Sequence, residues 1–86
     1  MNFLGYELNY NLGVTRDIKK AFGKDYMEVI QTTPDVDHII KFLYNTLDKD
    51  VRNQVRFNEF ADEVYNSEYG LMKLIDIYND ITIKIM

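Results

Sequence analysis

The segment TPDVDHIIKFLYNTL, residues 33–47, predicts the central helix of the chain. Thr33 suits the N-cap and Pro34 the first helical position, where a missing N–H group costs little. Asp35 and Asp37 then place negative charge near the positive end of the helix dipole. Apolar side chains recur along one face at the helical period: Val36, Ile39, Ile40, Leu43, Tyr44 and Leu47. We therefore expect this face to form the centre of the core.

Two more helices are expected after this segment, beyond a polar connection at residues 48–54. The first repeats the helical period through Phe57, Phe60, Ala61, Val64 and Tyr65, and we expect residues 66–70 to end it. The second carries Leu71, Leu74, Ile75, Tyr78 and Ile81 at helical spacing. Residues 81–86 are open between helix and strand, because isoleucines at 81, 83 and 85 also alternate.

The N-terminal residues show a different period. Tyr6, Leu8, Tyr10 and Leu12 alternate with polar residues, which is typical of a strand with one solvated face. Residues 2–4 are expected to form the other arm of a short hairpin that turns at Leu4 and Gly5. Two strands alone are marginal, so this hairpin must pack on helices.

Two helices are expected between the hairpin and the central helix. Val14, Ile18, Ala21 and Phe22 define an amphipathic helix that ends at Gly23. Asp25 and Glu28 then have the spacing of a capping box for a short helix over residues 25–30. We expect that helix to turn Tyr26, Met27 and Ile30 inward.

Together these elements predict a mainly α protein: a small helical bundle of four to five helices with a short N-terminal β-hairpin. The 86 residues, 47% of them hydrophobic and 28% charged, are ordinary for a single domain over residues 1–86. A chain this short buries only about 60% of its unfolded surface, so a partner could supplement its core.

Composition argues against several classes of function. A net charge of −4 disfavours a general affinity for nucleic acid, and the basic residues near Lys19 are interleaved with acidic ones. No window approaches 18 uninterrupted apolar residues, and the first residues lack the pattern of a secretory signal. Cysteine is absent, which agrees with a reducing compartment. We expect a cytoplasmic protein that binds neither nucleic acid nor membrane.

Residues 48–59 nearly match an EF-hand calcium loop. Asp48, Asp50 and Glu59 occupy ligand positions of that motif. However, Arg52 places a cation where a ligand should face the metal, and Asn53 stands where the motif has glycine. We therefore expect a polar connection that holds no metal. A degenerate EF-hand-like helical adaptor, or a calcium-linked protein-interaction module, is the alternative function.

No residues suggest catalysis. The one histidine, His38, lies off the apolar face of the central helix, so we expect it at the surface. The chain has a single serine, and neither a glycine-rich phosphate loop nor a P-loop lysine occurs. Acidic pairs such as Asp62 and Glu63 fit a solvated helix face. The sequence therefore predicts no enzymatic activity, no catalytic residue and no cofactor.

Tyrosine is abundant, with seven residues beside five phenylalanines. Tyrosine buries an apolar ring and leaves a hydroxyl for water or a partner, and it is enriched at interfaces. Tyr26, Tyr65 and Tyr69 flank predicted helix ends and are our candidates for partner binding. The alternative is that they cap a small core.

The order of these elements resembles a known family. FLGYELNYNLG, residues 3–13, is similar to a short N-terminal hairpin, and VTRDIKKAFGKDYMEVI, residues 14–30, to a first helix that closes in glycine. Residues 36–47 and 57–65 resemble an apolar helix, a polar turn and a Glu-rich helix. This is the layout of the small tail assembly chaperones of long-tailed bacteriophages, particularly those that infect Gram-positive hosts.

The resemblance implies a non-enzymatic chaperone made in the cytoplasm of the infected cell. Such a protein coats the tape-measure protein, keeps its long helices soluble and recruits tail-tube subunits. The partners implied are thus the tape-measure protein and the tail-tube protein, and self-association is left open. After the EF-hand-like adaptor, a helical DNA-binding regulator is the third interpretation.

Overall fold

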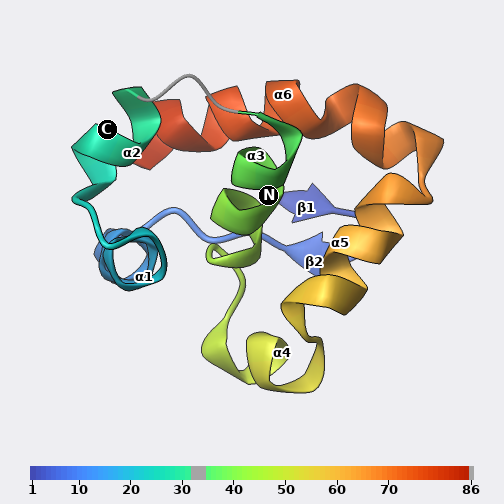
Figure 1. Ribbon diagram of the computed structural model, residues 1–86, viewed down its shortest axis with the longest axis horizontal. Coiled ribbons are helices and arrows are strands. Elements are labelled where there is room, and N and C mark those ends of the chain that lie inside the picture. The colour runs from blue at the N-terminus through green and yellow to red at the C-terminus, as the bar shows by residue number, and fades with distance from the viewer. Residues whose placement is uncertain (32–34, 86) are drawn as a thin grey trace.

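The computed structural model describes residues 1–31 and 35–85, shown in Figure 1. These residues contain a two-stranded antiparallel hairpin followed by six helices, which confirms the mainly helical prediction. The elements are β1 (Asn2–Phe3), β2 (Tyr6–Glu7), α1 (Leu12–Phe22), α2 (Tyr26–Gln31), α3 (Val36–Tyr44), α4 (Lys49–Gln54), α5 (Phe57–Tyr65) and α6 (Glu68–Ile85). The sequence therefore identified the hairpin and five of these helices, and missed α4.

Helix α3 lies in the middle of the molecule, with α1 on one side, α5 on the other and α6 along the top of the view in Figure 1. It contacts both α5 and α6, while α1 contacts α2. The buried apolar core draws on the hairpin and on every helix but α4: Phe3, Leu8, Val14, Ile18, Val29, Ile39, Ile40, Phe42, Leu43, Leu47, Phe60, Val64, Leu74, Ile77, Tyr78 and Ile81.

The hairpin turns at Leu4 and Gly5, as predicted. Asn2 pairs with Glu7 and Phe3 with Tyr6, and both turn residues have positive φ (53° and 85°). This backbone suits glycine but is unfavourable for leucine. A Cβ atom added to Gly70 of α6 would lie 3.3 Å from the Leu4 side chain, so packing on α6 helps to hold Leu4 in place.

The predicted strand over residues 6–12 is wrong beyond Glu7. After this residue the chain leaves the hairpin, and the Asn9 N–H donates to the carbonyl of Thr46, 2.9 Å away. Leu8 is buried, but Tyr10 and Leu12 are exposed, the latter by 79%. Asn11 instead begins α1, because its side chain accepts a hydrogen bond from the Val14 N–H.

Helix α1 ends at Gly23 as predicted, with the left-handed backbone (φ 68°) that glycine adopts most easily. The predicted inward face of α2 is wrong for Met27 and correct for Ile30, which packs against the core. Val29 is fully buried, Ile30 is partly buried and Met27 is half exposed. The Tyr26 side chain lies outside the described part of the structure.

Helix α3 begins at Val36, and Asp35 is its N-cap: the carboxylate accepts from the His38 N–H at 2.7 Å. The predicted N-cap and first residue, Thr33 and Pro34, lie outside the described residues. The buried face differs from the prediction, because Val36 is 42% exposed whereas Phe42 is fully buried. A helix covered by neighbours on several sides has no single apolar stripe.

The start of α6 also differs from the prediction. The Ser67 hydroxyl accepts from the Gly70 N–H at 3.0 Å, so residues 66–70 do not form a long break. The chain turns at Asn66 and Ser67, and α6 then continues through residues 81–85 as helix. Its buried face consists of Gly70, Leu74, Ile77, Tyr78 and Ile81. Leu71 and Ile75, predicted to be inside, are exposed.

Candidate protein-interaction surface

Tyr65 is the last residue of α5, and its side chain joins α5 to α3. Its hydroxyl donates a hydrogen bond to the Asp37 carboxylate in the first turn of α3. That bond, assisted by burial and by the charges of Asp37 and Asp35, raises the pKa of Tyr65. The residue is nevertheless 47% exposed. Tyr65 therefore offers a ring at the surface while its hydroxyl is already occupied.

Tyr69 lies four residues further on, in the first turn of α6, and is 55% exposed. It forms one wall of a surface hollow whose other lining residues are Lys73, Asp76, Ile77, Asn79 and Asp80. Within the described part of the chain its hydroxyl makes no hydrogen bond. Of the two candidate tyrosines whose side chains the structure describes, Tyr69 is the one that leaves both ring and hydroxyl available.

Tyr26 is separate from these two. It begins α2, whereas Tyr65 and Tyr69 flank the turn between α5 and α6. In Figure 1 these places lie at opposite ends of the longest axis. The structure thus brings two of the three candidates near one another, and the binding role of all three remains a prediction.

The outward side of α6 carries apolar residues that the sequence analysis had placed in the core or passed over. We call Leu71, Met72, Ile75 and Ile83 the outer stripe of α6. Met72, Ile75 and Ile83 are 72%, 61% and 65% exposed. The available signal was that α6 has more apolar residues than one face can bury. Leu71 and Ile75 are four residues apart, and so are Leu74 and Tyr78, so two different stripes have helical spacing.

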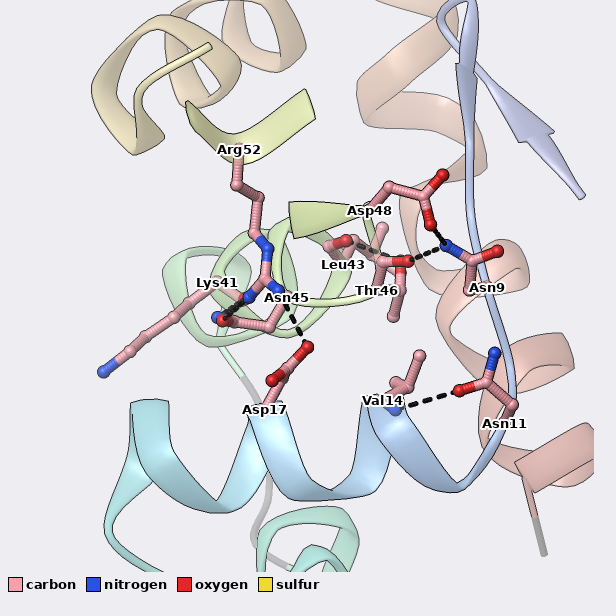
Figure 2. A network of polar contacts seen from close by, with 10 residues as sticks. All are labelled: Asn9, Asn11, Val14, Asp17, Lys41, Leu43, Asn45, Thr46, Asp48 and Arg52. Atoms are coloured by element: carbon pink, nitrogen blue, oxygen red, sulfur yellow. Dashed lines mark hydrogen bonds and ion pairs between the residues drawn. The ribbon is translucent and has the colours of Figure 1, made fainter. Parts of the chain in front are cut away.

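A polar network, shown in Figure 2, joins α1, α4 and the end of α3. Arg52 of α4 donates to Asp17 of α1 at 2.7 Å and to the Asn45 side-chain oxygen at 3.1 Å. The Asn45 amide in turn donates to the Lys41 carbonyl at 2.8 Å. These hydrogen bonds satisfy the Lys41 carbonyl and the Asn45 side chain at the C-terminal end of α3. The arrangement accounts for Arg52 as a structural residue.

The near-EF-hand segment does not form a calcium loop. Residues 49–54 form helix α4, so the expected polar connection is wrong there, whereas Glu59 lies in the first turn of α5. Asp48 instead accepts a hydrogen bond from the Asn9 amide at 2.9 Å. In residues 1–31 and 35–85 no three His, Cys, Asp or Glu side chains gather where they could hold a metal ion.

His38 is not the surface residue that we expected. Its imidazole packs against Phe22 of α1, with ring centroids 4.9 Å apart, and edge-on to Tyr78 of α6 at 6.4 Å. Its Nε2 atom is buried without a hydrogen-bond partner in the described structure. Burial lowers the pKa of His38, although Asp35 and the backbone of Val29 oppose that shift. His38 shares a helix face with buried Phe42, which explains its position.

Comparison of the chain with protein-family models, with curated proteins and with solved structures finds no match. Among the described helices, none combines the length and the apolar character needed to cross a bilayer. The surface of the molecule is therefore the basis for inferring its function. Its distinctive feature is an outward apolar helix stripe with an exposed tyrosine at its N-terminal end.

Proposed function

We propose that this protein is a non-enzymatic tail assembly chaperone of a long-tailed phage, which binds the helices of a tape-measure protein and helps to recruit tail-tube subunits. The observation that carries the proposal is the outer stripe of α6, where Met72, Ile75 and Ile83 face solvent at helical spacing. An apolar stripe of this kind suits packing against the apolar side of another helix.

Two further features support a role in binding. A chain of 86 residues has a modest core, so association with a partner adds stability to both molecules. The stripe is also short, and a single contact of this size is weak. Many copies arranged along one long partner would together hold it firmly, because each bound copy raises the effective concentration of the next site.

The test is co-expression with the tape-measure protein encoded in the same genome, with the soluble fraction of that partner as the readout. We expect the partner to stay soluble with this protein and to precipitate without it. The double substitution Met72→Ser and Ile75→Ser should abolish the effect while the circular dichroism of the purified variant stays helical. Tyr65→Ser and Tyr69→Ser should weaken it.

Leu12→Ser is the matched control, because Leu12 is 79% exposed but belongs to α1. Equal losses from this control would mean that apolar surface in general, rather than α6, keeps the partner soluble. A partner that stays equally soluble without the protein would rule out the chaperone function. The genes beside this one give an independent check: a tail-tube gene upstream and a long helical tape-measure gene downstream are expected.

A further inference from the structure

The outward side of α6 also carries three carboxylates, those of Glu68, Asp76 and Asp80, with the exposed Lys73 at their edge. From this arrangement we propose that the helix bound by α6 is edged by arginine or lysine, and that the hollow beside Tyr69 receives one of these cationic side chains. This inference rests on the proposed function, because it specifies the chemistry of the helical partner. Three observations carry it: the apolar stripe, the acidic residues along it and the lining of the hollow.

The outer stripe defines the shape of the occupant. Leu71, Met72 and Ile75 lie within one turn, and Ile83 lies about two turns further along the same side. The 18 residues of α6 span roughly 27 Å. A helix laid along this stripe can bury apolar side chains over several turns, whereas a strand has no matching spacing.

The charges beside the stripe are acidic. Glu68, Asp76 and Asp80 project from the same half of the helix as Met72, as their spacing along α6 requires. None of these three carboxylates forms an ion pair or a side-chain hydrogen bond within the described residues. The nearby cation of Lys84 is directed elsewhere, since its ammonium lies 5.0 Å from the centre of the Tyr10 ring. Among the described residues, acidic side chains therefore outnumber cationic ones along this face, with Lys73 beside the hollow.

The hollow beside Tyr69 fits a long cationic side chain. Asp76 and Asp80 are one turn apart and line the hollow together with the Tyr69 ring and Ile77. The apolar stem of an arginine or lysine can pack against the Tyr69 ring and Ile77, while its cationic end pairs with the carboxylates of Asp76 and Asp80. Lys73 lines the hollow too, so its flexible chain must turn toward solvent when the hollow is occupied.

A second copy of the chain is a poorer occupant. Two α6 helices packed through their outer stripes would bring Glu68, Asp76 and Asp80 of both copies to the same interface. Like charges held close together oppose association. A partner with a basic edge removes this repulsion and replaces it with attraction, so charge selects a different molecule.

Two synthetic helical peptides of 18 residues provide the probe. Both carry the same leucine face, but one has arginine along its edges and the other glutamate, and binding is followed by fluorescence anisotropy. We expect the arginine peptide to bind more tightly, and its affinity to fall with added salt. The pair Asp76→Asn and Asp80→Asn should weaken it roughly fivefold, in line with two exposed ion pairs. Met72→Ser with Ile75→Ser should abolish binding of both peptides.

Asp50→Asn is the matched control, because Asp50 is an exposed carboxylate on α4, away from α6. Equal binding of the two peptides, or an equal loss with Asp50→Asn, would overturn the inference. So would a dimer in sedimentation that dissociates on Met72→Ser. If the tape-measure protein is kept soluble but neither peptide binds, the inference fails and the proposed function stands. If the arginine peptide binds as expected but the partner precipitates, the proposed function fails alone.

Discussion

The guanidinium of Arg52 lies 2.7 Å from the carboxylate of Asp17, and this ion pair joins α4 to α1 across 35 residues of sequence. Both side chains are partly shielded from water, with 17% and 35% of their surface exposed. The same guanidinium also satisfies the Asn45 side chain, which is buried. Arg52 therefore stabilises three elements at once.

Replacing Arg52 by alanine should lower the free energy of unfolding by about 1 to 2 kcal/mol, because Asp17 and Asn45 both lose a charged hydrogen-bond partner while water screens part of the loss. Urea denaturation measures the difference. Lys49→Ala is the control, since Lys49 lies on the same helix and forms no ion pair in the described structure. It should stay within about 0.5 kcal/mol. Equal losses of stability in the two variants would show that the Arg52–Asp17 ion pair makes no specific contribution to the free energy of unfolding.

Ile40→Ala should destabilise the protein by roughly 2 to 5 kcal/mol, because Ile40 is fully buried in the central helix and its loss leaves a cavity. Ile75→Ala is the same substitution at a position that is 61% exposed, and it should change stability by less than about 0.5 kcal/mol. Chemical denaturation of both variants measures these changes in the free energy of unfolding. A loss below about 1 kcal/mol at Ile40 would mean that the core is centred elsewhere.

The parts of the fold that depend on local chemistry were predictable. The turn at Leu4 and Gly5 and the end of α1 at Gly23 both follow from glycine's access to positive φ. Helical periodicity identified five helices because each has an apolar side that must be buried. Helix α4 was missed because it buries no residue, so it has no apolar period to detect.

The error in α6 arose because the helix has two apolar sides, and tertiary packing determines which of them is buried. In α6, Leu71 and Ile75 fit a helical stripe as well as Ile77 and Ile81 do. In the folded protein the second set faces the core, and Gly70, on the same buried side, lies close to the Leu4 side chain. The outer stripe, and with it the candidate site, could not be found from the sequence for this reason. Tyr69 was chosen as a candidate because a tyrosine near a helix end is suited to an interface, and its binding role stays a prediction.

Calcium should not bind with micromolar affinity. Asp48 and Asp50 lie at the start of α4, Glu59 lies on α5, and Arg52 is paired with Asp17. A calcium site requires six to eight oxygen ligands around one point, which this backbone does not assemble. Titration calorimetry on the intact protein tests the prediction. A micromolar dissociation constant that is lost on Glu59→Gln would instead favour the EF-hand-like adaptor.

Tyr6 should titrate at an unusually high pH. Burial, a hydrogen bond from its hydroxyl to Glu63 at 2.6 Å, and the charges of Glu63 and Glu59 together raise its pKa from 10.0 to about 12. The protonated phenol is thus favoured by folding. Its contribution to stability is complete below pH 10 and is lost as the pH rises from 10 toward 12.

Nuclear magnetic resonance of ring-labelled tyrosine follows this titration directly. The resonance of Tyr6 is assigned as the one that disappears in the Tyr6→Phe variant. Glu63→Gln should lower the pKa of Tyr6, because the substitution removes a negative charge that opposes the phenolate. Asp62→Asn is the adjacent control, and it should leave the titration unchanged. A pKa of Tyr6 near 10 in the unaltered protein would contradict the hydrogen bond between Tyr6 of β2 and Glu63 of α5.

His38 should make the protein less stable in mildly acidic solution. The imidazole lies against Phe22 and Tyr78, and the cations of Lys41 and Lys24 disfavour a further positive charge beside them. Burial, the largest effect, lowers the pKa of His38 from its usual 6.5, so the folded state favours the neutral ring. The unfolded chain binds a proton first as the pH falls. The stabilisation is therefore complete above pH 6.5 and is lost as the pH drops through the folded pKa.

The chain has one histidine, so its ring proton resonances report the pKa of His38 without ambiguity. Urea denaturation at pH 8 and pH 5 should show a loss of stability on acidification that is smaller in His38→Gln, whose side chain does not titrate in this range. Comparing the two pH values within each protein cancels any packing defect of the variant. An equal loss in both proteins, together with a His38 pKa near 6.5, would place the imidazole in water rather than between α1 and α6.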